Sequence, residues 1–150
     1  MKNLQIPFDD GGDFPDQRSA MVYITGNTTT NPAYHQDRIR ALKHLFRKTG
    51  ATGVRKIIDF GCGDGMYFKE FFGDPANSVD KITGIDISKP MLELAAENLR
   101  DFPFESRAGG VEALSSIQDQ RFDLGLAIDV LGYLKEHELD VFFREMSRLI

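Results

Sequence analysis

Residues 56–72 read KIIDFGCGDGMYFKEFF, which places a short apolar run and an acidic residue directly before three alternating glycines and a helical pattern. Gly61, Gly63 and Gly65 allow backbone conformations that other residues avoid, and they let a ligand approach the main chain closely. Because the loop leads into a helix amino terminus, its N–H groups and the helix dipole favour a negative group such as a phosphate or carboxylate. The segment therefore predicts a strand, a ligand-binding loop and a helix in direct succession.

Strand and helix patterns alternate through the rest of the chain. Strand patterns occupy 56–60, 81–86, 102–108 and 122–129, and helix patterns occupy 66–72, 88–99 and 111–117. An earlier helix begins at Asn31 and Pro32 and is stopped by Gly50. We expect the last helix to place one continuous apolar face on a sheet, formed by Leu139, Phe142, Phe143, Met146, Leu149 and Ile150. This order predicts an α/β fold, a doubly wound and mainly parallel sheet with helices on both faces and ligands beyond the carboxyl ends of the strands.

The composition fits one domain with a core and restricts the partners. The chain has 150 residues, 41% of them apolar, and its net charge of −5 without a dense basic block argues against a nucleic-acid substrate. The single Cys62 and the lack of a signal peptide or a membrane-spanning run predict a cytoplasmic protein with no membrane partner. We expect no metal site, because the three histidines show no ligand spacing. Residues 1–33 have loop composition and predict an arm or lid, and residues 34–150 predict the core domain.

The glycine spacing distinguishes two classes of ligand. A dinucleotide-binding loop would read Gly-x-Gly-x-x-Gly, but here Met66 stands at the third glycine position. Asp59, two positions before the first glycine, would repel a pyrophosphate but suits a ligand that carries an ammonium group as well as a carboxylate. The loop therefore favours an amino-acid moiety over NAD(P).

The segment DFGCGDG resembles motif I of the class I S-adenosylmethionine-dependent methyltransferases, Asp/Glu-x-Gly-x-Gly-x-Gly. The resemblance extends from about Asn31 to Ile150 and includes GIDIS at the end of the second strand and FDLGLAIDVLGYL as motif IV. It implies a Rossmann-like methyltransferase fold, S-adenosyl-L-methionine as cofactor and S-adenosyl-L-homocysteine as product. In the family the glycine loop accepts the methionine part of the cofactor, which assigns that part to Asp59, Gly61, Cys62 and Gly63.

The resemblance assigns further residues to the rest of the cofactor. Asp86 ends the second strand, where a carboxylate can accept hydrogen bonds from both ribose hydroxyls. Ile87 and Met91 offer apolar surfaces suited to the adenine face. The family often has an aspartate after the third strand that recognises the adenine amino group, but Gly110 stands there. The adenine contact is therefore expected from backbone around Gly110 and Val111, or from Glu112.

Two residues after the fourth strand are the candidates for catalysis. Asp129 is expected to touch the cofactor amine and Tyr133 to face the acceptor, although the family frequently has histidine at the Tyr133 position. Methyl transfer needs mainly an in-line nucleophile in a water-poor site, so a catalytic base is optional. An oxygen, nitrogen or carbon nucleophile fits equally well.

Two motifs of nucleic-acid methyltransferases are missing, which favours a small-molecule acceptor. IDVLGY stands where amine-modifying enzymes carry Asn/Asp-Pro-Pro-Tyr/Phe, and Cys62 lies inside the glycine motif instead of in a separate nucleophile loop. The alternatives are an NAD(P)-dependent oxidoreductase and a catalytically silent methyltransferase-like module that binds a partner.

The family sheet has seven strands in the order 3-2-1-4-5-7-6, and the last three strands are expected to be missing from this chain. The fourth strand would then have an unpaired edge. This edge predicts that the polypeptide is a fragment of a longer protein, or that a partner strand or a homo-oligomer covers it.

Overall fold

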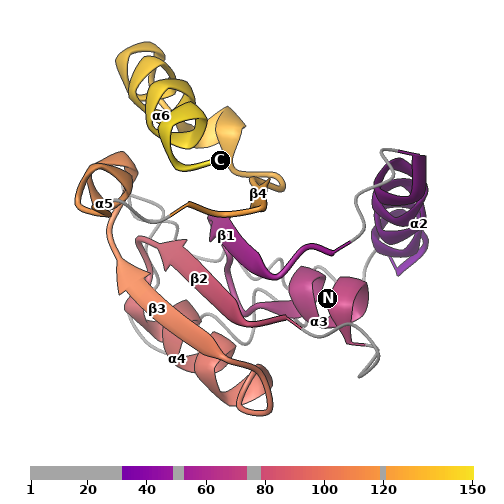
Figure 1. Cartoon of the computed structure of the whole chain (residues 1–150). Coiled ribbons are helices and arrows are strands. Elements are labelled where there is room, and N and C mark those ends of the chain that lie inside the picture. Colours follow the sequence, from indigo (N-terminus) through magenta and orange to yellow (C-terminus); the bar gives the residue numbers. More distant parts are fainter. Residues whose placement is uncertain (1–31, 49–52, 74–78, 119–120) are drawn as a thin grey trace, which may run out of the picture.

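The computed structural model describes residues 32–48, 53–73, 79–118 and 121–150. Four parallel strands form one sheet: β1 (Lys56–Phe60), β2 (Lys81–Asp86), β3 (Phe104–Ala108) and β4 (Leu124–Leu126). Their spatial order is β3-β2-β1-β4, which matches the first four strands of the predicted arrangement. The glycine loop follows β1, a strand with neighbours on both sides, so the loop lies at the middle of the carboxyl edge of the sheet (Figure 1).

Helices cover both faces of the sheet, as predicted. The described helices are α2 (Pro32–Lys48), α3 (Met66–Phe72), α4 (Lys89–Asn98), α5 (Val111–Ser115) and α6 (Glu136–Leu149), with a short 3-10 helix at Leu131–Tyr133. In Figure 1, α5 and α6 lie on one side of the sheet, α3 and α4 lie on the other, and α2 stands beside α3. The arm predicted for residues 1–33 lies outside the described residues, apart from Pro32 and Ala33 in α2. None of the described helices has the length and apolar character needed to cross a bilayer.

Alternation along the strands divides the core into two clusters. Ile58 of β1 is buried beneath α5 and α6, where the ring centroids of Phe60 and Phe142 are 5.1 Å apart. Ile57 is buried on the opposite face with Phe68, whose ring meets the edge of Phe102 at 5.5 Å. Successive side chains of a strand point to opposite faces, so the apolar run of β1 supplies both clusters.

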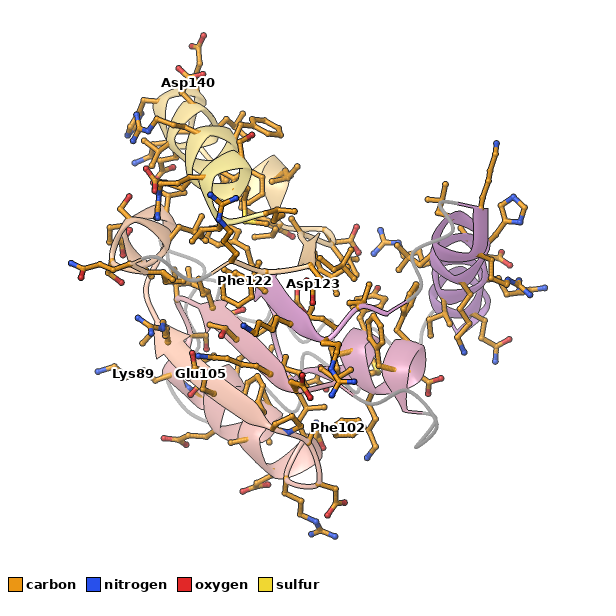
Figure 2. The ribbon with its side chains drawn as sticks, viewed as in Figure 1. Lys89, Phe102, Glu105, Phe122, Asp123 and Asp140 are labelled. Atoms are coloured by element: carbon orange, nitrogen blue, oxygen red, sulfur yellow. The ribbon has the colours of Figure 1, made fainter. Side chains whose placement is uncertain are left out.

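The fourth strand is shorter than predicted. The sequence pattern covered 122–129, but only Leu124–Leu126 pairs, because β1 is its single neighbour among the described strands. Before the strand, Phe122 donates its N–H to the Leu149 carbonyl at 2.8 Å, and the Asp123 carboxylate accepts the N–H of Lys56 at 2.8 Å. Figure 2 shows Phe122 and Asp123 beside the start of β1. These contacts fix where β4 begins without extending the ladder.

The apolar face predicted for the last helix is only partly buried. Phe142, Met146 and Leu149 are buried, but Phe143 is 57% exposed and Ile150 is 52% exposed. Successive helical residues are rotated by about 100°, so Phe143 lies on the flank of the stripe that Phe142 occupies. The prediction that the whole face packs on the sheet is therefore wrong for Phe143 and for much of Ile150, which reaches Gly125 with the tip of its side chain.

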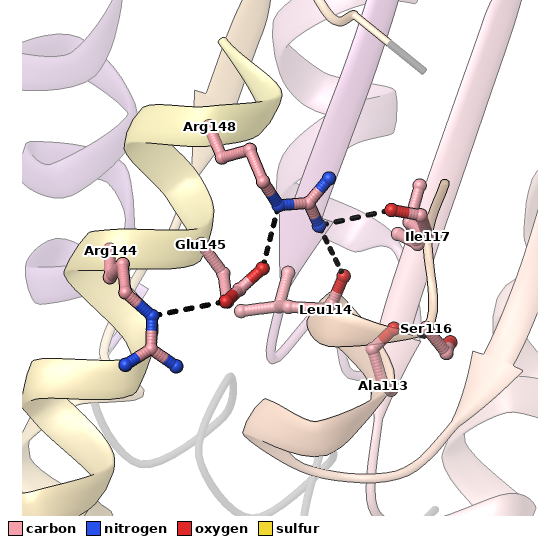
Figure 3. A network of polar contacts seen from close by, with 7 residues as sticks. All are labelled: Ala113, Leu114, Ser116, Ile117, Arg144, Glu145 and Arg148. Atoms are coloured by element: carbon pink, nitrogen blue, oxygen red, sulfur yellow. Dashed lines mark hydrogen bonds and ion pairs between the residues drawn. The ribbon is translucent and has the colours of Figure 1, made fainter. Parts of the chain in front are cut away.

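A polar network joins α6 to α5 (Figure 3). Arg148 donates to the Leu114 carbonyl at 3.2 Å, to the Ile117 carbonyl at 3.0 Å and to the Glu145 carboxylate at 2.8 Å. Arg144 donates only to Glu145, at 3.2 Å, from a side chain that is 67% exposed. The two arginines share one partner, but only Arg148 satisfies the carbonyls at the end of α5.

Arg148→Ala is expected to lower the free energy of unfolding by about 1 to 3 kcal/mol, because the Leu114 and Ile117 carbonyls and the Glu145 carboxylate each lose one charge-assisted hydrogen bond. Leu114 keeps the Ile117 N–H at 3.1 Å, and Glu145 keeps Arg144. Arg144→Ala is the matched control and should cost less, about 0.5 kcal/mol, because the Arg144 side chain is 67% exposed and Glu145 keeps its bond to Arg148. Urea unfolding of the three proteins measures both values. Equal losses for the two variants would show that the bonds to α5 contribute nothing to stability.

Candidate functional site

The loop after β1 is built by backbone hydrogen bonds that depend on its glycines. Gly61 and Cys62 both donate to the Ile85 carbonyl, at 2.7 and 3.1 Å, and Gly65 donates to the Cys62 carbonyl at 3.0 Å. The φ angles of Gly61, Gly63 and Gly65 are 74°, 54° and 75°, in the left-handed region that favours glycine. The loop is thus tied to the end of β2 before it enters α3.

The three glycines differ in what surrounds them. A Cβ at Gly61 would lie 2.5 Å from the Val130 side chain, and one at Gly65 would lie 2.7 Å from Leu99. A Cβ at Gly63 would meet no atom of the described residues within 4 Å. Gly61 and Gly65 therefore permit close packing inside the protein, and Gly63 is the position where the backbone faces open space.

Asp86 connects the glycine loop to the end of β2. Its Oδ2 accepts the Gly63 N–H at 2.9 Å, and its Oδ1 accepts the Ser88 N–H at 2.9 Å. An ionised carboxylate has about four acceptor positions. A carboxylate of this kind can accept several donors at once, and the predicted contact with two ribose hydroxyls stays a prediction.

Asp59 is a buried carboxylate at the centre of this edge. It is 4% exposed, and its side chain accepts no hydrogen bond from the described residues. Burial, and to a smaller extent the nearby charge of Asp86, together raise the pKa of Asp59 to about 7. Burial and the Asp59 carboxylate also raise the pKa of the Cys62 thiol, so this cysteine is not an activated nucleophile.

The residues predicted for the adenine end have different environments. Ile87 is 45% exposed, whereas Met91 is 6% exposed and belongs to the core, behind the Ser88 cap of α4. Val111 packs partly against the core cluster beneath α5 and α6. The Gly110 N–H donates to Glu112 Oε1 at 2.7 Å, so this amide is already used within the loop. Glu112 and the exposed Ile87 are therefore better placed for a ligand than the Met91 side chain or the Gly110 amide.

The turn after β4 brings a basic residue to Asp129. Asp129 has a φ of 60°, the one positive value found for a non-glycine among the described residues. Its Oδ2 forms an ion pair with Arg38 of α2, and Arg38 also donates to the Tyr67 hydroxyl at 3.3 Å. Tyr133, the other catalytic candidate, is 70% exposed.

The sequence prediction missed Arg38 and Tyr67. Arg38 falls at the i, i+4 and i+7 spacing of Leu42 and Leu45, so a charge on the apolar stripe of the first helix was the available signal. Tyr67 is the second residue of α3, directly behind the glycines.

Residues 57–150 match a family model described as a methyltransferase domain, which covers more than half of the sequence. The chain belongs to this methyltransferase domain family. The resemblance to class I S-adenosylmethionine-dependent methyltransferases is thereby confirmed at the level of the family. No curated protein sequence matches the chain.

Solved methyltransferase structures share the fold. An amino pentose methyltransferase from Micromonospora echinaspora, CalS10, with bound S-adenosylmethionine, is 20% identical with a TM-score of 0.66 over 86% of this chain and 51% of its own. The N-methyltransferase NodS from Bradyrhizobium japonicum, in complex with S-adenosyl-L-homocysteine, is 18% identical with a TM-score of 0.65 over 79% and 57%. A methyltransferase from Leishmania major is 17% identical with a TM-score of 0.71 over 89% and 56%. This chain thus spans a little over half the length of these structures.

Proposed function

We propose that this methyltransferase domain binds S-adenosyl-L-methionine at the glycine loop and transfers its methyl group to a small-molecule acceptor. One observation carries the proposal: a buried Asp59 carboxylate without a hydrogen-bond partner among the described residues lies behind a loop whose backbone is open at Gly63. This arrangement suits a ligand with an ammonium group. The bound S-adenosylmethionine and S-adenosyl-L-homocysteine in the solved structures of CalS10 and NodS support the same cofactor.

The proposed roles follow the order of the strands. Asp59 binds the amino group, the Gly61–Gly63 loop with Cys62 holds the methionine part, and Asp86 accepts the ribose hydroxyls. For the adenine, the exposed Ile87 supplies a contact surface and the buried Met91 supports it from below. The backbone of Gly110 and Val111, together with Glu112, is proposed to contact the edge of the adenine ring.

When bound, S-adenosylmethionine supplies an activated methyl group on a sulfonium that leaves as a neutral thioether. The protein then has two tasks. It has to orient the acceptor, and, if the nucleophilic atom of the acceptor carries a proton, it has to accept that proton. Asp129 is proposed for the second task, because Arg38 holds its carboxylate at the carboxyl edge beside β4. Tyr133 is proposed as part of the acceptor wall, since its exposed ring is open to contact.

The acceptor is proposed to be a small molecule, methylated on oxygen, nitrogen or carbon. The solved relatives include an amino pentose methyltransferase and an N-methyltransferase, which supports this size of substrate. Three further statements stay predictions from the sequence. They are the cytoplasmic location, the partner or second copy at the second edge of β4, and the division into an arm at 1–33 and a core at 34–150.

Calorimetric titration of the purified protein with S-adenosyl-L-homocysteine and with NAD tests the cofactor. We expect S-adenosyl-L-homocysteine to bind at least about 100-fold more tightly, equivalent to about 2.7 kcal/mol, because a pyrophosphate would meet the Asp59 carboxylate and bury negative charge beside it. Tighter binding of NAD would favour the oxidoreductase alternative. Cofactor binding without methylation of any acceptor would favour the silent module.

A further inference from the structure

We propose that a ligand with a cationic amino group binds at the glycine loop in exchange for a proton on Asp59, so that cofactor binding releases a proton and strengthens as pH rises. The inference rests on the proposed function and deepens it, because it gives Asp59 a different protonation state in the free and bound protein. It follows from the burial of Asp59, the absence of a donor to its carboxylate among the described residues, and the charges around it.

The position of Asp59 in the sheet leaves little of the residue exposed. Asp59 pairs with Gly84 of β2 on one side and with Leu126 of β4 on the other, so its backbone is enclosed within the sheet. The residue is 4% exposed. An ionised carboxylate in such a position needs a donor or a cation to replace its hydration, and the described residues provide neither.

Among the described residues, no positive charge at this edge compensates the charge of Asp59. Asp86 at the end of β2 is the charge that acts on it most strongly, and the glycine loop adds the neutral thiol of Cys62 and the carboxylate of Asp64. Beyond β4, Arg38 of α2 is paired with Asp129 and bonded to Tyr67 of α3. Burial and the charge of Asp86 raise the pKa of Asp59 to about 7, so a large share of free molecules carry the proton at neutral pH.

The exchange balances in protons and charge. The protonated Asp59 loses its proton to the buffer, and the resulting carboxylate accepts hydrogen bonds from the ligand's ammonium group, which supplies both the donors and the positive charge. No covalent bond to carbon or sulfur changes in this step. In the complex, the ion pair between the Asp59 carboxylate and the ligand's ammonium group therefore takes the place of the O–H bond that kept the carboxyl group neutral in the free protein.

Titration calorimetry with S-adenosyl-L-homocysteine in two buffers of different ionisation enthalpy counts the protons released. With a pKa of about 7 for Asp59, release should be about 0.9 proton at pH 6.0 and about 0.5 at pH 7.0, and affinity should increase about fivefold between these values. Release below about 0.2 proton at pH 6.0 with intact binding would overturn the proposal and leave the proposed function standing. Failure of S-adenosyl-L-homocysteine to bind at either pH would overturn both.

Asp59→Asn and Asp64→Asn form the matched pair of variants. Asp59→Asn imitates the protonated state, so its affinity should no longer change between pH 6.0 and 7.0, and its release should fall below about 0.2 proton. Asp64 accepts the Met66 N–H at 3.2 Å through an oxygen that asparagine retains, so Asp64→Asn should release protons like the parent. Equal release from the Asp59→Asn variant and the parent would show that another group loses the proton.

Thermal melting without ligand keeps the test independent of binding. A raised pKa in the folded protein means that the folded state holds the proton more tightly than the unfolded chain, so this contribution to stability is lost as pH rises towards about 7. The parent should therefore lose more stability between pH 5 and pH 8 than Asp59→Asn does. An identical pH dependence of the two melting temperatures would contradict a proton held by Asp59.

Discussion

Gly61→Ala is expected to lower the free energy of unfolding by about 2 to 5 kcal/mol, whereas Gly63→Ala should cost only about 1 to 2 kcal/mol. Both residues have a positive φ, 74° and 54°, so both substitutions strain the backbone. Only at Gly61 does the new methyl group also meet a neighbour, the Val130 side chain at 2.5 Å. Urea unfolding of the two variants at one pH measures the difference.

Cofactor binding should be weakened more by Gly63→Ala than by Gly61→Ala, which is the reverse of their expected order in stability. Gly63 faces open space on the ligand side, so a methyl group there would occupy the volume that a bound molecule needs, and affinity should fall at least about tenfold relative to the parent. The affinity of folded Gly61→Ala should fall less, because its methyl group points at Val130. If Gly63→Ala binds S-adenosyl-L-homocysteine as tightly as the parent does, the ligand does not approach the loop at this residue.

Asp86→Ala is expected to weaken cofactor binding by about 1.5 to 3 kcal/mol, the range for hydrogen bonds to a charged group, which is about 10-fold to 150-fold in affinity. The structure adds a second effect. The variant also removes the acceptor of the Gly63 and Ser88 N–H groups, so stability should fall by about 1 to 3 kcal/mol. Binding must therefore be measured at a temperature where the variant is folded, by calorimetry after a thermal melt.

Asp101→Ala is the control for Asp86→Ala. Its side chain is 86% exposed and meets Arg100 only at 3.9 Å, so neither affinity nor stability should change beyond about 0.5 kcal/mol. A parental affinity of Asp86→Ala in the folded protein would remove Asp86 from the ribose contact and leave it a purely structural role.

Much of the fold could be predicted because the patterns that specify it are local. The β1 strand and the glycine loop follow from adjacent residues, and the helix pattern at 88–99 corresponds to α4, whose Ser88 cap accepts the Met91 N–H in the structure. Parallel strands joined by helices then restrict the strand order to few choices, and the observed β3-β2-β1-β4 order is among them. The acidic strand ends, Asp59 and Asp86, were found in the same way.

Features that depend on packing between distant segments were missed or only partly correct. Phe143 has the periodicity of a buried residue, but it lies on the flank of the buried stripe of α6 and is 57% exposed. The burial of Met91 was likewise not visible in the sequence: its side chain is 6% exposed and belongs to the core, and its assignment to the adenine stays a prediction. A side chain's periodicity shows which face it shares, not how far the neighbouring element extends.

The sequence by itself determined the strand-loop-helix units, the positions of the glycines and the carboxylates at the strand ends, because backbone preference and side-chain alternation act between near neighbours. Only the tertiary structure decided that Gly61 packs on Val130 while Gly63 stays open, and that Arg38 of α2 pairs with Asp129 beyond β4. It also decided that Asp59 is buried beside Asp86 without a donor among the described residues. These properties are distances between side chains on different elements, and they exist only after the helices have packed on the sheet.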